Sequence, residues 1–200
     1  MRNFSYIVVA MAALLLTGCL VMSLHPFFTE NDAVFEKSLV GMWVDKSGEA
    51  SLTFKQFGAN AYRVTFVQHA NSSPMKGKER PGEPAEFEAH LGRIGGSLFL
   101  DLYPDKDSWR RLKNDLLAVH LAPAHTISRV SLQGDNLVIA GLEHDWLKEL
   151  VAKDSAAIAH EKVEGAIVLT ASTDALQEFL QHHAADPKAF SDGDEFHRQK

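Results

Sequence analysis

Residues 85–103 read AEFEAHLGRIGGSLFLDLY, and no other stretch of the chain predicts its fold so clearly. Phe87, Ala89 and Leu91 alternate with polar side chains, and a leucine stands at every second position from residue 98 to residue 102. A period of two is typical of antiparallel strands that bury one face. Gly95 and Gly96 separate the two runs, and both central positions of a two-residue hairpin turn favour positive φ. We therefore expect a β-hairpin here.

Similar alternation extends along the chain on both sides of this hairpin, and short turns separate most of the runs. The expected strands cover residues 39–45, 51–57, 62–67, 85–94, 97–103, 125–133, 137–142 and 163–170. We predict a mainly β (α+β) fold, an antiparallel meander of eight or nine strands that forms a barrel or a strongly curved sheet. Closure into a barrel is the simplest arrangement because it removes the free sheet edges.

Helices are expected near the carboxyl terminus. One begins near Glu143 and buries a stripe that starts at Trp146. A second follows the capping residues 172–174, with Leu176, Phe179 and Leu180 on its apolar face. Residues 104–120 fit either a helix or a strand. The polar residues 187–200 are expected to be a flexible tail whose removal costs little stability.

Composition limits the possible functions. The 200 residues include 26 acidic and 20 basic side chains, and this balance argues against nucleic acid as a partner. There is one cysteine, Cys19, so the chain can form no intramolecular disulfide and no thiolate metal site. The length fits a single domain.

The amino terminus carries a motif for export. Arg2 precedes an apolar run over residues 7–22, which is shorter than the ~20 residues that span a bilayer. Leu16-Thr17-Gly18-Cys19 resembles the lipobox of bacterial lipoproteins. The resemblance implies cleavage before Cys19, a diacylglyceryl group on its sulfur and acylation of the new amino terminus. A plain cleaved signal and an uncleaved membrane helix are the alternatives.

The expected organisation follows from that motif. Residues 1–18 form a signal peptide, 19–35 the lipid-anchor site and tether, 36–186 one β-rich domain, and 187–200 the tail. Phe27, Phe28 and Phe35 make the tether apolar, so we expect it to pack on the domain and hold it near the membrane. By the same resemblance, Leu20 is not the aspartate that retains lipoproteins in the inner membrane. In a cell with two membranes, the outer membrane facing the periplasm is the expected location.

Gly41-Met42-Trp43 is similar to the G-x-W motif on the first strand of lipocalins. In that family the tryptophan closes one end of the barrel, often beneath an arginine. The second lipocalin motif is absent, and no final-strand arginine is evident in the sequence. The resemblance implies a barrel that holds a small apolar or amphipathic ligand. The candidate ligand-binding residues are Trp43, Phe54, Tyr62, Phe66 and Phe87.

Which face of each strand points into the barrel decides between two functions. If the large residues point inward, the barrel is filled and the protein is a structural or interaction protein of the envelope. If the faces are reversed, a polar lumen can take an amphipathic guest. The first set is Leu52, Phe54, Tyr62, Val64, Phe66, Phe87 and Leu91, and the second is Thr53, Arg63, Thr65, Glu86 and Glu88.

A third hypothesis is a hydrolase that uses histidine and acid. His120 and His125 bracket Pro123, with Asp115, His144 and Asp145 nearby in sequence. Residues five apart on a strand face opposite sides, so we expect structural histidines instead. Glu178 and His182 form an ordinary helix pair, and Lys76, Lys78 and Arg80 lie in a solvated loop. We assign no catalytic residue, metal or cofactor.

Overall fold

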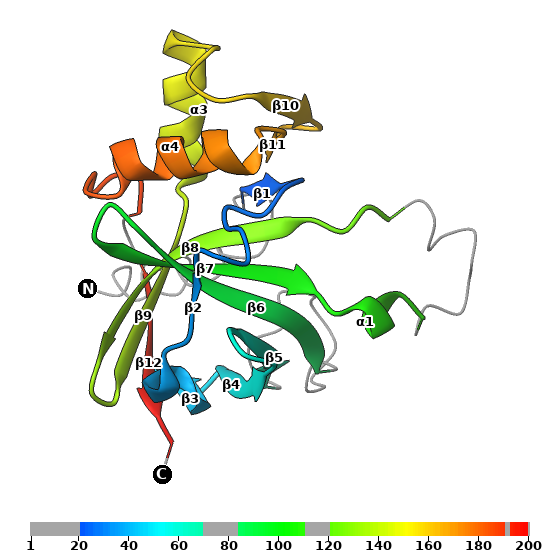
Figure 1. Ribbon diagram of the computed structural model, residues 1–200, viewed down its shortest axis with the longest axis vertical. Helices are drawn as coiled ribbons and strands as arrows, with labels where there is room; N and C mark the ends of the chain where they lie inside the picture. Colours follow the sequence, from blue (N-terminus) through cyan, green and yellow to red (C-terminus); the bar gives the residue numbers. More distant parts are fainter. Residues whose placement is uncertain (1–20, 70–83, 111–120, 191–192, 200) are drawn as a thin grey trace, which may run out of the picture.

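The structure is a computed structural model, and it describes residues 21–69, 84–110, 121–190 and 193–199. Its main feature is a closed antiparallel barrel of eight strands, each paired with the next around the ring (Figure 1). This confirms the predicted mainly β fold. In order around the barrel, the strands are β3 (Gly41–Asp45), β4 (Ala50–Phe57), β5 (Ala61–Gln68), β6 (Ala85–Ile94), β7 (Ser97–Pro104), β8 (His125–Gln133), β9 (Asn136–Gly141) and β12 (Asp194–Arg198).

The hairpin predicted from residues 85–103 is present. β6 pairs with β7 from Phe87 opposite Pro104 to Ile94 opposite Ser97. Gly95 and Gly96 have φ of +56° and +80°, the left-handed values that the turn requires. The predicted strand over residues 39–45 begins later, because a 3-10 helix, η1 (Lys37–Leu39), precedes β3.

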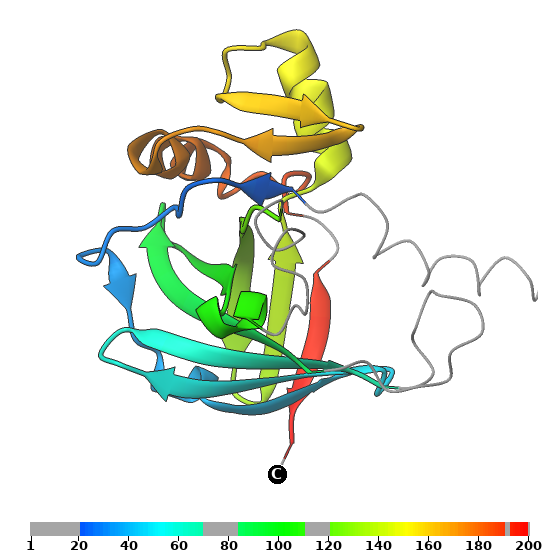
Figure 2. The ribbon, with the colours of Figure 1, turned by 90° about the vertical axis from the view of Figure 1, so that its right-hand side faces the viewer.

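The chain leaves the barrel after β9 and forms a small layer before it returns as β12. The layer contains α3 (His144–Lys153), β10 (His160–Val163), β11 (Ala166–Leu169) and α4 (Thr173–His183). Figure 2 shows this layer on one side of the barrel. α1 (Lys106–Arg110) is a short helix after β7. Among the described residues, no helix has both the length and the apolarity needed to cross a bilayer.

The segment before the barrel packs on its outer wall. β1 (Met22–Ser23) pairs with both β8 and β11, and β2 (Ala33–Val34) pairs with β6. Phe27 is fully buried and Phe35 stacks on Tyr62 at 5.1 Å between ring centroids. Thr173 of α4 also donates a hydrogen bond to the Pro26 carbonyl at 2.9 Å. The expected packing of residues 21–35 on the domain is therefore confirmed.

Two separate apolar cores result. The first fills the barrel, and its buried members are Leu39, Trp43, Leu52, Phe54, Tyr62, Val64, Ala89, Leu91, Leu100, Val130, Leu137 and Phe196. The second lies between the outer wall and the small layer, and includes Phe27, Phe99, Ile127, Leu147, Ile167, Leu176, Phe179, Leu180 and Phe190. The large side chains of β4, β5 and β6 thus point inward, which confirms the first of the two face assignments.

The prediction of a flexible tail over residues 187–200 is wrong for residues 194–198. These residues form β12, which pairs with β9 on one side and β3 on the other. Phe196 is 6% exposed and stands opposite Leu137 and Asp45. Its burial, together with backbone hydrogen bonds to two otherwise free edges, outweighs the polar composition of the segment.

We expect Phe196→Ala to lower the free energy of unfolding by about 3–5 kcal/mol, the range for emptying a core phenylalanine site. Phe57→Ala is the control, because Phe57 is 42% exposed and its loss should cost about 1 kcal/mol or less. Urea denaturation of the two variants measures both values. Equal stability of Phe196→Ala and the unsubstituted protein would show that β12 does not close the barrel.

Candidate functional site

A tryptophan of the first barrel strand lies beneath an arginine of the last barrel strand. Trp43 is fully buried, and its Nε1 donates a hydrogen bond to the Leu39 carbonyl at 2.8 Å. The guanidinium carbon of Arg198 lies 4.2 Å from the centroid of the Trp43 ring. A cation over an aromatic face is attracted by the ring quadrupole. The expectation that the final strand carries no such arginine is therefore wrong.

The surrounding backbone holds Arg198 in place. Its Nη1 donates to the Val40 carbonyl at 2.9 Å, its Nη2 donates to the Ser38 carbonyl, and its Nε lies 3.3 Å from Asp135 Oδ1. Gly41 is required here: its φ is +138°, and an added Cβ would lie 2.6 Å from Arg198 Nη1. The glycine of the Gly41-Met42-Trp43 motif therefore makes room for the arginine over the tryptophan. Sequence reasoning missed Arg198 because it treated the last strand as a tail.

The five predicted ligand-binding residues all belong to the interior of the barrel. Trp43, Phe54 and Tyr62 are at most 1% exposed, whereas Phe66 and Phe87 are partly buried at the edge of the same core. The Tyr62 hydroxyl accepts a hydrogen bond from the Glu36 amide at 2.6 Å and donates one to the Glu36 carbonyl at 3.1 Å. None of these five residues lines the cavity described below. A binding role for these five residues stays a prediction.

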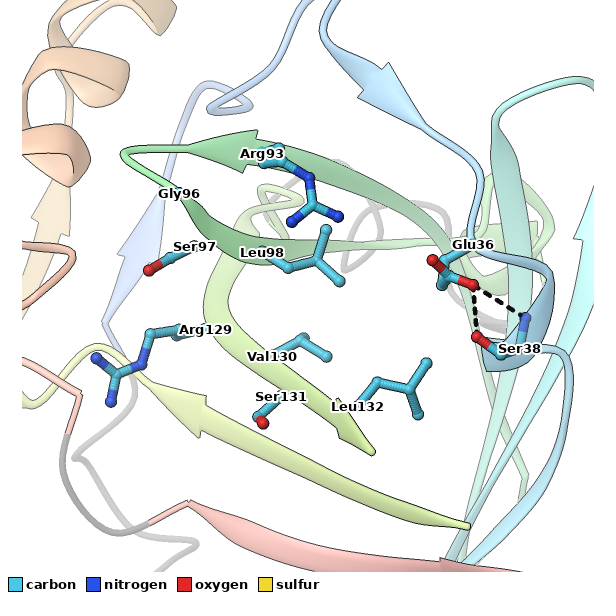
Figure 3. A pocket seen from close by; sticks show the side chains of 10 residues that line it. All are labelled: Glu36, Ser38, Arg93, Gly96, Ser97, Leu98, Arg129, Val130, Ser131 and Leu132. Carbon is cyan, nitrogen blue, oxygen red and sulfur yellow. Dashed lines mark hydrogen bonds between the residues drawn. The ribbon is translucent and has the colours of Figure 1, made fainter. Parts of the chain in front are cut away.

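A cavity of about 550 Å³ opens beside η1, whose residue Ser38 lines it. We call it the rim cavity. Its volume falls within the range of small-molecule pockets. It lies among β6, β7, β8 and the segment before β3 (Figure 3). The lining residues are Glu36, Ser38, Arg93, Gly96, Ser97, Leu98, Arg129, Val130, Ser131 and Leu132.

Among the residues that the structure describes, the rim cavity combines an apolar floor with one free cation. Leu98 and Leu132 are the outermost members of the barrel core, and Val130 is buried beside them. Arg93 is exposed and directs its guanidinium into the cavity (Figure 3). In the described part of the chain, Arg93 makes no hydrogen bond and no ion pair. Its donors are therefore available to a ligand.

The other two charged groups of the rim cavity already have partners. Arg129 donates to the Ala184 carbonyl at 2.9 Å and to the Phe190 carbonyl at 2.8 Å. Glu36 accepts hydrogen bonds from the Ser38 hydroxyl at 2.5 Å and the Ser38 amide at 3.3 Å. These bonds lower the pKa of Glu36 below its usual value, with a small further effect of the Arg93 charge. Arg129 thus joins the barrel to the outer layer, while Glu36 stays ionised opposite Arg93.

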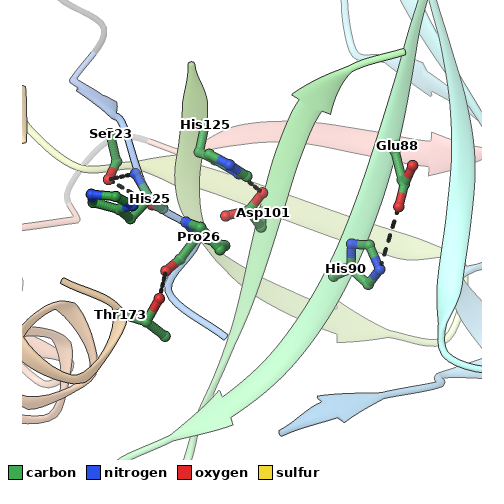
Figure 4. Close-up of polar contacts among 8 residues, drawn as sticks. All are labelled: Ser23, His25, Pro26, Glu88, His90, Asp101, His125 and Thr173. Atoms are coloured by element: carbon green, nitrogen blue, oxygen red, sulfur yellow. Dashed lines mark hydrogen bonds and ion pairs between the residues drawn. The ribbon is translucent and has the colours of Figure 1, made fainter. Parts of the chain in front are cut away.

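A histidine–acid cluster lies on the outer wall, beneath the amino-terminal segment (Figure 4). Asp101 is 1% exposed and its Oδ1 lies 2.6 Å from His125 Nδ1, while its Oδ2 has no hydrogen-bond partner among the described residues. Burial raises the pKa of Asp101, although the hydrogen bond with His125 opposes the shift. His90 stacks on Phe28 at 4.3 Å, and its Nε2 lies 3.7 Å from Glu88. The cluster thus fastens the amino-terminal segment to the barrel.

An aspartate behind a partly exposed histidine can orient that histidine as a general base. Ser23 pairs with His125 in the sheet, but its hydroxyl donates to the His25 carbonyl at 2.7 Å and is not directed as a nucleophile. His120 and Asp115, the expected neighbours of His125, lie outside the described residues, as do Cys19, Lys76, Lys78 and Arg80. The acid that His125 does contact, Asp101, was missed because it lies 24 positions away in sequence.

The remaining histidines occupy separate places. His144 contacts its neighbour Asp145 at 3.3 Å and the Gly165 carbonyl at 3.3 Å, away from His125. His182 donates to the Glu178 carbonyl at 2.8 Å on the exposed side of α4, as expected for a helix pair. Across the ranges that the structure describes, no three His, Cys, Asp or Glu side chains come together in a way that could hold a metal ion.

Comparison with known proteins identifies no relative. No protein-family model matches the chain, and neither a curated protein nor a solved structure matches it.

His90 should make stability depend on pH. Burial is the main cause that lowers its pKa in the folded protein, with Glu88 and Asp101 opposing. Between that lowered value and the unfolded value of about 6.5, the unfolded chain binds a proton that the folded protein resists. The contribution of neutral His90 to the free energy of unfolding is therefore complete above about pH 6.5, and it is lost as the pH falls toward the lowered pKa. When the pH is lowered from about 7.5 to about 5.5, we expect the free energy of unfolding to fall less in His90→Gln than in the unsubstituted protein.

Urea denaturation at the two pH values measures this difference. Because burial also lowers the pKa of His183, which both proteins retain, some pH dependence should persist in the variant. His182→Gln, on the exposed side of α4, controls for the loss of an imidazole. An unchanged pH dependence in His90→Gln would rule out the expected contribution.

Proposed function

We propose that this protein is a membrane-anchored lipoprotein of the bacterial envelope, and that its barrel is a lipocalin-like binding module for a small apolar or amphipathic ligand. One observation carries the proposal: Arg198 of the last barrel strand lies 4.2 Å over Trp43 of the first. The lipocalin resemblance of Gly41-Met42-Trp43 implies this arrangement, and the sequence alone did not reveal it. A closed barrel of eight strands is compatible with such binding.

The alternative is an envelope interaction protein with a solid core. The inward-facing aromatic and aliphatic side chains of β3 to β6 favour this alternative, because they leave Trp43, Phe54 and Tyr62 at most 1% exposed. The rim cavity favours the binding module, since its volume of about 550 Å³ suits a small molecule. Ligand titration separates the two functions.

The anchoring part of the proposal rests on the lipobox and on the contacts of the residues that follow it. Val21 is 5% exposed, and the next two residues form β1, which is held on both edges. Two residues span at most about 7 Å. A lipid on Cys19 would therefore hold this side of the domain at the membrane surface. With two membranes in the cell, we propose the periplasmic face of the outer membrane.

We expect Cys19→Ser to block lipidation and to accumulate as uncut precursor. One acyl chain gives marginal membrane binding and a second makes it stable, so a triacylated protein should remain with membranes through high-salt washing. Labelled palmitate followed by fractionation measures both effects. Ser23→Ala, which leaves the lipobox intact, is the control. Equal palmitate incorporation by Cys19→Ser and the unsubstituted protein would contradict the lipoprotein proposal.

We expect the chain from Leu20 onward, which retains every described contact, to bind an environment-sensitive dye with saturable one-to-one stoichiometry. Fatty acids should displace the dye, because a pocket of this size holds one amphipathic molecule. Fluorescence titration of the folded protein measures binding, and the urea-unfolded protein is the control. Failure of the folded protein to bind would leave the interaction protein as the surviving function.

A further inference from the structure

We infer that the ligand of this protein is an amphipathic anion, held in the rim cavity with its charged head on Arg93 and its apolar part on Leu98, Val130 and Leu132. This inference rests on the proposed binding function and adds the place and the chemical class of the ligand. The site lies outside the packed interior, between η1 and the ends of the β6–β7 hairpin and β8.

The charge of the head group follows from the state of the three ionised side chains in the cavity. Arg129 donates to two backbone carbonyls, and Glu36 Oε1 accepts two hydrogen bonds from Ser38. Glu36 keeps its negative charge, and the two arginines outweigh it. Arg93 alone directs unused N–H donors into the space (Figure 3). A guanidinium matches the geometry of a carboxylate or a phosphate, which it can bind with two parallel hydrogen bonds. A cationic head group would meet Arg93 as a like charge.

The need for an apolar part in the ligand follows from the apolar side chains that form the floor of the rim cavity. Leu98 and Leu132 are partly buried members of the barrel core that face the cavity, and Val130 is 6% exposed. Water on these side chains is displaced when an alkyl chain covers them, which favours binding by roughly 25 cal/mol per Å² of apolar surface removed from water. A simple inorganic anion gains nothing from this surface, so the site selects for an anion with an attached apolar group.

The packed interior explains why the ligand lies at the rim. Leu91 and Leu100 stand opposite each other in the β6–β7 hairpin, two positions along from Leu98, and both are at most 1% exposed, as is Leu137 on β9. A guest of ligand size would have to displace these side chains, and overpacking a filled core costs stability. In the rim cavity no core side chain has to move.

Isothermal titration calorimetry on the chain from Leu20 onward tests the inference with three probes of equal length: decanoate, decyl phosphate and decyltrimethylammonium. The unsubstituted protein should bind the two anions more tightly than the cation. Arg93→Gln should weaken the binding of both anions by about 10- to 100-fold, the effect of losing a charge-assisted hydrogen bond. It should not weaken the binding of the cation, because the substitution removes a like charge. Decanoate and decyl phosphate distinguish a fatty-acid head group from a phosphate head group.

Two further variants complete the test. Lys55→Gln removes an exposed cation of β4 that lines none of the described cavities, and it should bind all probes normally. Leu98→Trp puts a larger side chain into the rim cavity without removing a charge, and it should weaken the binding of all three probes. Thermal melting verifies that each variant folds.

The outcomes separate this inference from the proposed function. Wild-type affinity of Arg93→Gln for both anions would overturn the rim site while leaving the binding function in place. Absence of binding of every probe to the unsubstituted protein would overturn the binding function and, with it, the site. Selective loss of anion binding in Arg93→Gln supports both.

Discussion

The pairing of β12 with β3 and β9 is the constraint on which the rest of the structure depends. Without this strand, the seven preceding barrel strands would form an open sheet with two unpaired edges, and unpaired backbone groups at an edge invite aggregation. Closure also buries Phe196 in the interior and brings Arg198 over Trp43. This five-residue strand thus provides backbone pairing, a buried core residue and the arginine that lies over Trp43.

The outer layer is the consequence of inserting α3, β10, β11 and α4 between the seventh and eighth barrel strands. It covers the outward faces of β7, β8 and β9, where Phe99 and Ile127 would otherwise expose apolar surface. Arg129 joins the two parts by donating hydrogen bonds to carbonyls that follow α4. The amino-terminal segment completes the layer, because Phe27 packs so closely on β6 that a Cβ at Gly92 would lie 2.6 Å from its ring. The segments before and after the described barrel strands, residues 21–35 and 194–198, therefore both pair with its strands.

The filled interior of the barrel and the position of the rim cavity have the same cause, which is the size of the inward-facing side chains. Large residues on the inward faces of β4 to β6 use the width of an eight-stranded barrel, which is sufficient for side chains or for one small ligand. The space that remains lies where the β6–β7 hairpin and β8 diverge near η1. There the apolar core ends at Leu98 and Leu132, and polar side chains begin. A boundary of this kind suits an amphipathic molecule, since each part of the ligand meets a surface of its own polarity.

Local patterns in the sequence determined much of the fold. Alternation at a period of two identified the strands and their inward residues, paired glycines identified the β6–β7 turn, and helical spacing identified Leu176, Phe179 and Leu180 as the buried face of α4. These signals are local, because they arise from the geometry of a single strand, turn or helix. Tertiary structure alone decided the role of residues 194–198, the partner of His125 and the isolation of Arg93. Each depends on segments far apart in the chain. β12 carries one buried aromatic residue and forms a strand only because the unpaired edges of β3 and β9 lie on either side of it. Asp101 contacts His125 only because their two strands are paired. The sequence by itself therefore determined seven of the eight barrel strands and the two longer helices. Contacts between distant segments decided how the barrel closes and where a charged group is left free to bind.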